Sequence, residues 1–503
     1  MKVYALFLIA VLLLIGACDI KDPVLPKWDV DLSVPLINDI FFVSELTENS
    51  DNIIVAEDSV LTVVADGDNT TGEFGNVPFS LDASLSNVPI PGNGYSGNIP
   101  FVDGSNNARI TYAQIVSGSF STSFSDINPS VQQIKLIFSS LKNFDGTPLE
   151  LINTGSNDWV ETSLEGFFLG EMNSGQLITS LPYTIQITPA LPQGSVAANF
   201  SFASDTTIRI SNFQGTLTNL QASLRPSTTL MDINYPLGMD QAVILQNASL
   251  LITMENYVGF AAKFSGRFKA SNDDGDIRYV DIVDHNGNNY YTTPSPAHGT
   301  PGIAVFEFEN NVSQLLQIMP TRIEIVDGIY TINSGNTIGE VRADDYIRTL
   351  YTIKAPLTVV FNDHEIVIRD EQEINIADDN RDRIRDNVLE ANLKLMIQNK
   401  LPIGAWANLF ISSTPEIDIA QPATYDFVKH AQVASYEMNP NFQTVELSLT
   451  KEQLDVFTNP SIFIRWSFSF NNSEHPVTIN ATTADFIHVK GMLVAKILVE
   501  EGI

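Results

Sequence analysis

The stretch LEANLKLMIQN, residues 389–399, decides the fold class of this 503-residue chain. Leu389, Ala391, Leu393, Leu395 and Ile397 alternate with mostly polar neighbours, and a period of two residues indicates a half-buried β-strand. The same alternation recurs at residues 250–254 and 462–470, between short segments rich in Asn, Ser, Thr, Gly and Pro. Strands punctuated in this way are typical of antiparallel sandwiches, so we predict an all-β protein with few and short helices.

A second stretch repeats this pattern 143 residues earlier in the chain. The segment ASLLITMEN, residues 248–256, parallels ANLKLMIQN, residues 391–399, and both run through a short turn into another apolar strand. A fainter first copy spans residues 120–131, where Phe120 and Phe124 precede a turn at Asp126 and Pro129 and a return strand from Val131. The chain is therefore expected to contain repeated strand–turn–strand units.

A helical motif recurs with about the same spacing. NSGQL (173–177), NVSQL (311–315) and TKEQL (450–454) are each followed by a proline, at 182, 320 and 460, and then by a strand. An Asn or Thr suited to an N-cap, with Gln three residues later, predicts a two-turn helix that the proline ends. Leu177, Leu315 and Leu454 are then expected to pack against the sheet of their own unit.

These motifs recur in the same order and predict three tandem, antiparallel, β-sandwich-like units of about 140 residues with short two-turn helices. We expect the units at 29–205, enlarged by loops, at 206–344 and at 345–503. The turn at residues 399–404 is faintly similar to strand–turn–strand segments of LEA/WHy-type immunoglobulin-like sandwiches, over about 25 residues. That resemblance implies an immunoglobulin-like β-sandwich.

The N-terminus reads as a targeting segment. Residues 3–17 form an apolar run that is too short to cross a bilayer but fits the core of a signal peptide. Ile15-Gly16-Ala17-Cys18 resembles the bacterial lipobox, with Ile15 where leucine is commonest. The resemblance implies removal of residues 1–17, a diacylglycerol on Cys18, an N-terminal tether at 18–28 and a lipid-anchored envelope protein. The expected location is the outer membrane, on its periplasmic or surface face; the alternative is ordinary secretion with cleavage near Ala17.

Charge and cysteine content limit the possible partners. Cys18 is the single cysteine, so no intrachain disulfide can form and stability must come from apolar cores. The net charge is −32, and it becomes −33 once Lys2 leaves with the signal peptide. Such a field repels nucleic acid and anionic lipid, and favours cations or basic envelope proteins as partners. Adaptation to a saline habitat is an equally good explanation of the charge.

Two acidic segments are candidates for calcium, the one cofactor that the sequence suggests. The first holds Asp273, Asp274 and Asp276. The second places oxygen side chains at positions 1, 3, 5 and 9 of a calcium-loop pattern, but Arg383 replaces the glycine of position 6 and Leu389 the glutamate of position 12. The alternative for both is a solvated acidic loop. The candidate ligands of the second segment are Asp378, Asn380, Asp382 and Asp386.

Signals for catalysis are weak. Gly92–Gly97 spells GxGxxG between prolines, and His364-Glu365 lacks the second histidine of HExxH, so neither a dinucleotide nor a zinc-hydrolase site is expected. The repeated residues cap, turn and pack, and no histidine recurs with the repeat. We therefore expect no catalytic residues and a non-enzymatic envelope array for adhesion, scaffolding or envelope assembly. The alternatives are a lipoprotein that binds glycan or an apolar lipid ligand, for which loop residue Trp159 is a stacking candidate, and a carboxylate-dependent glycosidase.

Overall fold

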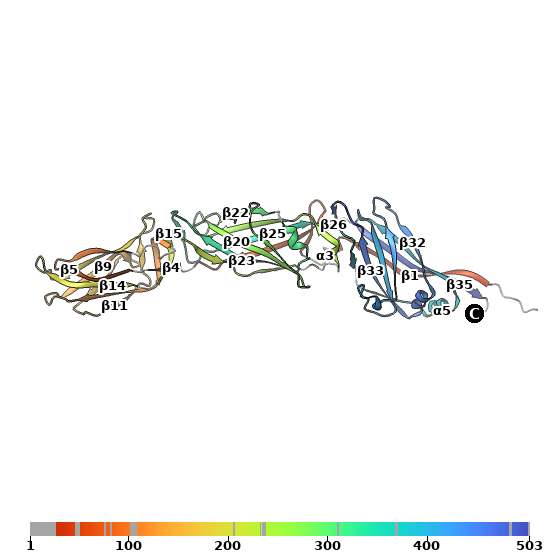
Figure 1. Cartoon of the computed structure of the whole chain (residues 1–503), viewed down its shortest axis with the longest axis horizontal. Helices are drawn as coiled ribbons and strands as arrows, with labels where there is room; N and C mark the ends of the chain where they lie inside the picture. The colour runs from red at the N-terminus through yellow and green to blue at the C-terminus, as the bar shows by residue number, and fades with distance from the viewer. Residues whose placement is uncertain are drawn as a thin grey trace, which may run out of the picture. The chain divides into compact units, whose positions relative to one another are not determined.

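The computed structural model describes residues 27–500, apart from 46–50, 75–76, 81–82, 101–107, 205–206, 232, 234–237, 309–310, 368–370 and 482–484. Strands dominate it and helices are short, so the predicted all-β fold is confirmed. The strands form three two-sheet sandwiches, which we call A, B and C in the order of their central strands (Figure 1). Cys18 lies outside the described residues.

Sandwich A is built around four strands of one sheet, in the order β11-β8-β14-β5, and four of the other, β10-β9-β13-β6. Phe120 of the first sheet packs on Phe138 of the second with ring centroids 5.1 Å apart, and Tyr183 packs on Phe200. These aromatic contacts close the core between the two sheets. The strands are β5 (Ala83–Pro91), β6 (Tyr95–Pro100), β8 (Ser119–Ser125), β9 (Gln133–Lys142), β10 (Pro148–Asn153), β11 (Val160–Ser163), β13 (Ser180–Thr188) and β14 (Val196–Ser204).

Sandwich B has the same order in its two sheets, β22-β19-β25-β3 and β21-β20-β23-β16. The short strand β2 (Ile53–Val55) precedes β3, and β17 (Thr228–Leu230) also pairs with β23. Phe268 meets Tyr351 edge to face across the core. The strands are β3 (Leu61–Thr70), β16 (Leu220–Ser223), β19 (Ser249–Asn256), β20 (Ala262–Ser271), β21 (Ile277–Asp281), β22 (Gly302–Phe308), β23 (Arg322–Ile332) and β25 (Ile347–Pro356).

Sandwich C repeats this order again, as β32-β29-β35-β1 and β31-β30-β33-β27, and Phe41 packs on Phe468 between the sheets. A small sheet, β18 (Val243–Leu245), β26 (Thr358–Phe361) and β34 (Val477–Thr478), belongs to the same unit. The strands of C are β1 (Lys27–Phe42), β27 (Glu365–Val367), β28 (Gln372–Asn375), β29 (Val388–Asn399), β30 (Ala405–Ser412), β31 (Phe427–Val433), β32 (Gln443–Ser448), β33 (Ser461–Phe470) and β35 (Phe486–Glu500).

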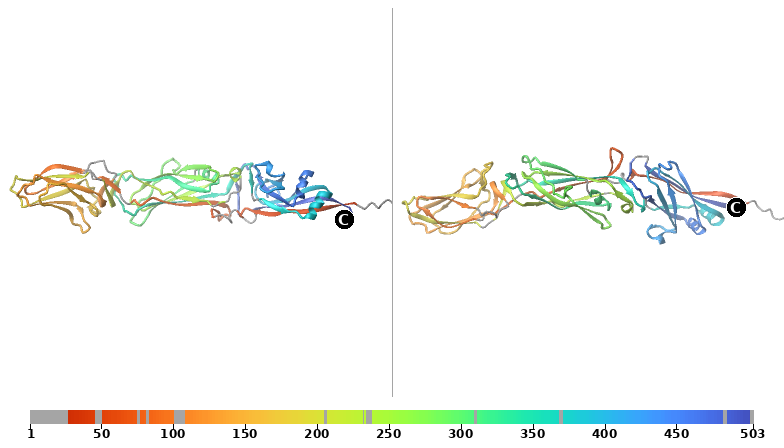
Figure 2. Two further views of the ribbon diagram at one scale, coloured as in Figure 1. Left: turned by 90° about the horizontal axis from the view of Figure 1, so that it is seen from below. Right: turned by 45° about the horizontal axis from the view of Figure 1, so that its top comes forward.

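The sandwiches are nested along the chain rather than contiguous. The eight core strands of sandwich A lie between β3 and β16, the first two core strands of B. The eight core strands of B lie in turn between β1 and β27, the first two core strands of C. In Figure 2 the red N-terminal strands accordingly run among the green and the blue ones. The sandwiches cross the predicted boundaries. Residues 29–70 of the predicted first unit supply β1 and β3 to sandwiches C and B, and β25 of sandwich B lies in the predicted third unit, 345–503. Alternation marks a strand without identifying its partner, so the sequence pattern could not show this exchange.

The contacts divide the chain into two compact units. The first unit contains sandwich C and consists of the described residues up to Thr62, Ile233–Gln246 and the described residues from Leu357 onward. The second unit contains sandwiches A and B and consists of Val63–Asp232 and Asn247–Pro356. The chain therefore passes between the units at four positions, and each unit folds from discontinuous segments.

Within the second unit, sandwich A carries extra strands that the sequence did not predict as strands. Its larger sheet runs β24-β15-β7-β12-β9-β13-β6, with β4 on β15. Strand β24 lies after β23 in the chain of sandwich B, so its pairing with β15 joins A to B through Phe213↔Val341 and Gln214↔Glu340. The extra strands are β4 (Val77–Ser80), β7 (Ala108–Ser117), β12 (Phe168–Gly170), β15 (Thr207–Leu217) and β24 (Gly339–Val341).

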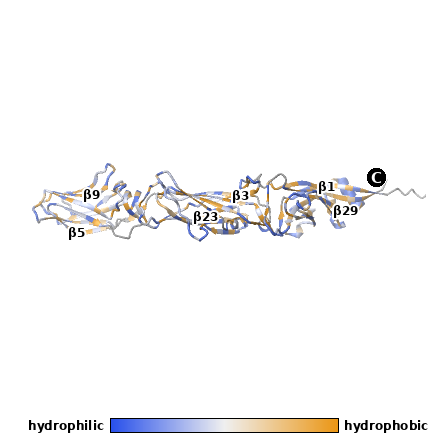
Figure 3. Ribbon diagram, turned by 90° about the horizontal axis from the view of Figure 1, so that it is seen from above, coloured by the Kyte–Doolittle hydropathy of each residue, from blue (hydrophilic) through white to orange (hydrophobic). Residues whose placement is uncertain are grey.

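Burial follows the predicted alternation. Along β29, Ala391, Leu393, Leu395 and Ile397 point into the core, but Leu389 is exposed because the pairing register shifts between Val388 and Glu390. Hydrophobic and hydrophilic positions alternate in the same way along other strands, such as β9 and β23 (Figure 3).

A buried asparagine ends the equivalent strands β19 and β29. Asn256 donates from Nδ2 to the Phe260 carbonyl at 2.7 Å and accepts from the Val258 N–H at 2.9 Å. Asn399 makes the same pair of bonds to Ile403 and Leu401, at 2.8 and 2.9 Å. The two segments that the sequence aligns thus share one corner, in which a side-chain amide satisfies backbone groups that the turn leaves unpaired.

The helical motif forms in two of its three places. Helix α4 (Val312–Leu316) buries Leu315 completely, and α6 (Lys451–Asp455) has the predicted capping box between Thr450 and Gln453. Leu454 is only half-buried, because α6 continues into the 3-10 turn η2 (Val456–Thr458), which buries Phe457 instead. Residues 173–177 are not helical: Leu177 is 37% exposed and Pro182 lies inside β13. Other helical segments in the part of the chain that the structure describes are α3 (Met239–Ala242), α5 (Asp378–Asn387) and η1 (Pro422–Thr424).

The corner asparagines give a test of the two units. Asn256→Ala and Asn399→Ala each leave a buried N–H and a buried carbonyl without their partner, so each variant should lose at least about 1–3 kcal/mol of unfolding free energy. Hydrogen exchange should place the lost protection in the unit that contains the substitution. Asn441→Ala, at an exposed position, is the control, and equal stability of all three variants would contradict the role of the corner.

A second test compares two leucines that the sequence treats as equivalent. Leu315→Ala removes a completely buried side chain and should cost about 2–5 kcal/mol, whereas Leu177→Ala acts on a partly exposed side chain outside any helix and should cost much less. Chemical denaturation of the two variants measures the difference. Equal losses would mean that Leu177 is packed as the repeat predicted.

Candidate functional site

The described part of the chain contains a cleft of about 510 Å³ in the unit that holds sandwiches A and B. It lies where β24 pairs with β15. Sandwich A contributes Gln214 and the segment around Asn173, and B contributes Tyr257, the loop at 295–298 and the segment 338–345. The lining is rich in polar and charged groups: Thr111, Asn173, Gln214, Tyr257, Ser295, His298, Glu340, Arg342 and Asp345.

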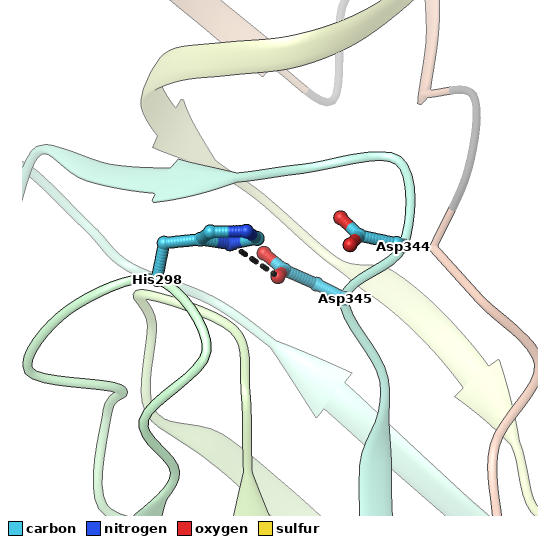
Figure 4. Close-up of side chains that lie close together, drawn as sticks. All are labelled: His298, Asp344 and Asp345. Carbon is cyan, nitrogen blue, oxygen red and sulfur yellow. Dashed lines mark ion pairs between the residues drawn. The ribbon is translucent and has the colours of Figure 1, made fainter.

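Three side chains with metal-ligating atoms meet at this cleft. His298, Asp344 and Asp345 each offer one such atom, and these atoms all lie within 4.8 Å of one another. Figure 4 shows the imidazole of His298 and the two carboxylates converging from two different loops. His298 Nδ1 is 3.9 Å from Asp345 Oδ1, which is an ion-pair distance but too long for a hydrogen bond. His298 and Asp344 are exposed, whereas Asp345 is buried.

Hydrogen bonds fix both loops. The Ser295 N–H donates to the Val258 carbonyl, and the Ser295 hydroxyl is within 2.8 Å of the carbonyls of Ala297 and Thr300, which shapes the turn that carries His298. On the other loop, the Arg342 N–H donates to Asp345 Oδ2 at 2.8 Å. The backbone carbonyl of Asp345 accepts from the Phe74 N–H at 2.8 Å. Hydrogen bonds therefore fix both the backbone and the side chain of Asp345.

Burial controls the charge of Asp345. The pKa of Asp345 is raised to about 6, mainly because burial removes solvent from the carboxyl. The neighbouring Asp344 also raises this pKa, whereas the Arg342 N–H, His298 and the Arg342 charge lower it. Arg342 itself pairs with Glu340, Nε to Oε1 at 2.6 Å, and Gln214 donates to the other oxygen of Glu340. The cleft therefore contains a buried acid beside an arginine that is already engaged.

The hydroxyls of the cleft are committed to backbone groups. Ser295 donates to carbonyls of its own loop, and the Thr111 hydroxyl donates to the Gln214 carbonyl at 3.1 Å. The available groups are thus an imidazole, carboxylates, amides and a phenol, which suit the binding of a cation or a polar ligand.

The first predicted calcium segment is the turn between β20 and β21. Asp273, Asp274 and Asp276 are exposed there. Asp273 accepts from the Thr321 hydroxyl at 3.0 Å, and the Asp276 N–H donates to Asn272 Oδ1 at 2.8 Å. The turn is thus stabilised by its own hydrogen bonds, and the structure brings its carboxylates into no group of three metal-ligating side chains among the residues it describes.

The second predicted calcium segment is a helix and not a loop. Residues 378–387 form α5, with Asp378 and Asp379 in its first turn. At 3.6 residues per turn, Asn380 points away from the face that carries Asp378, Asp382 and Asp386, so the four cannot surround one ion. Asp378 pairs with Arg381, and Asp382 pairs with Arg385 at 3.1 Å. Arg383, which replaces the glycine of the calcium-loop pattern, lies in this helix with Arg381 and Arg385, and arginine favours a helix.

The tryptophan side chains differ in how far they are exposed to solvent. Trp159 is 54% exposed on the loop before β11, where a stacking role is sterically open. Trp466 is buried in the core of C, whereas Trp406 is 42% exposed because it points out from β30.

Sequence reasoning missed the His298 cluster. His298 and Asp344 lie 46 residues apart in two irregular loops, outside any spacing motif. The adjacent acids Asp344 and Asp345 were the available signal, and the sheet pairing that brings them to His298 could not be read from it.

No family model matches the chain, and no curated protein matches it. Among solved structures, it is similar to a candidate secreted protein from Parabacteroides distasonis ATCC 8503, with 11% identity and a TM-score of 0.37 over 93% of this chain and 99% of the other. It also matches infectious bursal disease virus Gx strain, with 10% identity and a TM-score of 0.15 over 90% of this chain and 82% of the other. Among the described residues, no helix has the length and apolar character that crossing a bilayer requires.

The helical state of α5 leads to a prediction about calcium. Asp382→Asn should leave the response of the thermal midpoint to calcium unchanged, and should alter stability by no more than about 1 kcal/mol, since it removes one exposed ion pair. Differential scanning calorimetry with chelator and with millimolar calcium measures both effects. A calcium-dependent rise that this substitution abolishes would restore the predicted site.

Proposed function

We propose that the chain is a lipid-anchored, non-enzymatic protein of the bacterial cell envelope, whose β-sandwiches serve in adhesion, scaffolding or envelope assembly. The lipobox-like sequence before Cys18 supports the anchor, and the apolar run before it supports export. A second acyl chain would make membrane binding stable, because one chain alone holds only marginally. We place the anchor in the outer membrane, with the sandwiches on its periplasmic or surface side.

The observation that carries this proposal is the course of the N-terminal segment. β1 begins nine residues after Cys18 and pairs with β35 along almost its whole length, from Lys27↔Glu500 to Phe42↔Phe486. The same segment then supplies β3 to sandwich B and β5 to sandwich A. The anchored end of the chain is thus hydrogen-bonded into every sandwich, an arrangement suited to a protein that holds its domains on a membrane.

The surface charge supports a scaffold with basic partners. With 59 acidic residues against 27 basic ones, the chain favours basic envelope proteins or cations and disfavours nucleic acid. Its repeated architecture places the same strand order three times without repeating the His298 cluster. We therefore assign the repeated part to architecture and specific contacts to the loops that differ.

The cleft in the second unit favours one alternative, a ligand-binding lipoprotein. Its volume of about 510 Å³ is adequate for a small molecule, and its lining of His298, Arg342, Asp345 and Gln214 suits a polar ligand such as a glycan better than a lipid. The two functions are compatible, because the cleft occupies one end of the β15–β24 pairing and leaves the other loops free to contact partners.

Cys18→Ala tests the anchor. The variant should be exported but recovered in the soluble fraction after a high-salt and carbonate wash, because the acyl acceptor has been removed. Ala17→Gly keeps a small residue before the cysteine and is the matched control, which should remain with the membranes. Retention of Cys18→Ala in the washed membranes would refute lipid anchoring through this residue.

A further inference from the structure

We propose that His298, Asp344 and Asp345 form a binding site for a divalent transition-metal ion, for which Zn²⁺ is the closest chemical match. The site is independent of the scaffold function proposed above. It rests on the convergence of the three side chains at the cleft, on the state of the Asp345 carboxylate and on the local charge.

The donor set selects the class of metal. One imidazole nitrogen and two carboxylate oxygens suit zinc and its neighbours, whereas calcium and magnesium prefer oxygen donors throughout. Zinc holds such atoms at about 2.0–2.2 Å, which sets neighbouring ligand atoms about 3.3–3.5 Å apart in a tetrahedron. His298 Nδ1 and Asp345 Oδ1 are 3.9 Å apart, and His298 lies on an exposed loop, so a small movement brings both onto one ion.

The Asp345 carboxylate has one oxygen available. Its side chain is only 6% exposed, and Oδ2 is fixed by the Arg342 N–H at 2.8 Å. Oδ1 receives no hydrogen bond from the residues that the structure describes and faces the imidazole across 3.9 Å. This oxygen keeps contact with solvent at the cleft, so a cation that enters the cleft can reach it.

Local charge and open space favour the same ligand. Arg342, an arginine whose charge acts on Asp345, pairs with Glu340 at 2.6 Å, so the two aspartates keep an excess of negative charge. His298 and Asp345 also line the cleft of about 510 Å³. Three protein ligands beside a cleft leave at least one coordination position for water or for a polar ligand, which is the arrangement of an open rather than a closed metal site.

The competing explanation is that His298 and Asp345 form only an ion pair, with Asp344 as an uninvolved surface residue. The experiment titrates the full-length, lipidated protein, freed of metal with chelator and kept in detergent, with Zn²⁺ by isothermal titration calorimetry. Co²⁺ is added in parallel, because its visible absorption reports on nitrogen ligation and coordination number. We expect one ion per chain and a thermal midpoint that rises with zinc concentration.

Asp344→Asn and His298→Ala change exposed side chains and should fold normally. Each should weaken zinc binding at least roughly tenfold and alter the cobalt spectrum. Asp274→Asn and His285→Ala, on exposed loops of the same sandwich, are the matched controls and should bind zinc as the unsubstituted protein does.

Three results would overturn the proposal. The first is the absence of zinc binding. The second is an equal affinity for zinc in the unsubstituted protein and in both variants, Asp344→Asn and His298→Ala. The third is binding of calcium or magnesium that is as tight as the binding of zinc. The first two would leave His298 and Asp345 as an ion pair.

Discussion

The pairing of the first strand with the last strand of each sandwich is the constraint on which the rest of the structure depends. β35 lies between β1 and β29, β25 between β3 and β19, and β14 between β5 and β8. Each last strand therefore needs its first strand to complete its hydrogen bonds, and without it the strand would become an open edge. An insertion between the first and second strands disturbs none of these pairs. The entropy of closing a loop grows slowly with its length, so a whole sandwich can occupy that position.

Much of the fold could be predicted from the sequence, because alternation and turn residues are local. The strands around Leu250 and Leu393 appear where their patterns place them, and the shared corner asparagines follow the aligned segments. The errors arise where tertiary context overrides a local pattern. A register shift turns Leu389 outward, and Gly175 of the NSGQL segment adopts a positive φ that a right-handed helix does not allow. The origin of β1 and β3 was not predictable from alternation, since pairing partners are chosen by packing across the whole chain.

The candidate site was beyond the reach of the same reasoning for a physical reason. His298 and Asp345 occupy irregular loops, and their meeting depends on the sheet pairing around β24, on the Ser295 turn and on the Arg342 N–H. None of these has a periodic signature. The acidic stretch that did have a recognisable spacing, residues 378–386, became a helix because its side chains pair with arginines one turn away. Spacing identifies a metal site only when the backbone between the ligands adopts the expected conformation.

The nesting of the sandwiches also sets an order of synthesis and assembly. A chain made from its N-terminus has the eight core strands of A by Ser204 and those of B by Pro356, but C is complete only at Glu500. β1 and β3 must therefore wait, unpaired, while the inserted sandwiches form, and long-range pairings of this kind are slow and exposed to aggregation. Their sequences suit this interval. β1 carries Asp29, Asp31, Pro35 and Asp39, and β3 carries Asp66 and Asp68. Acidic side chains and proline discourage pairing between chains, so these strands stay available for their late partners within the same molecule.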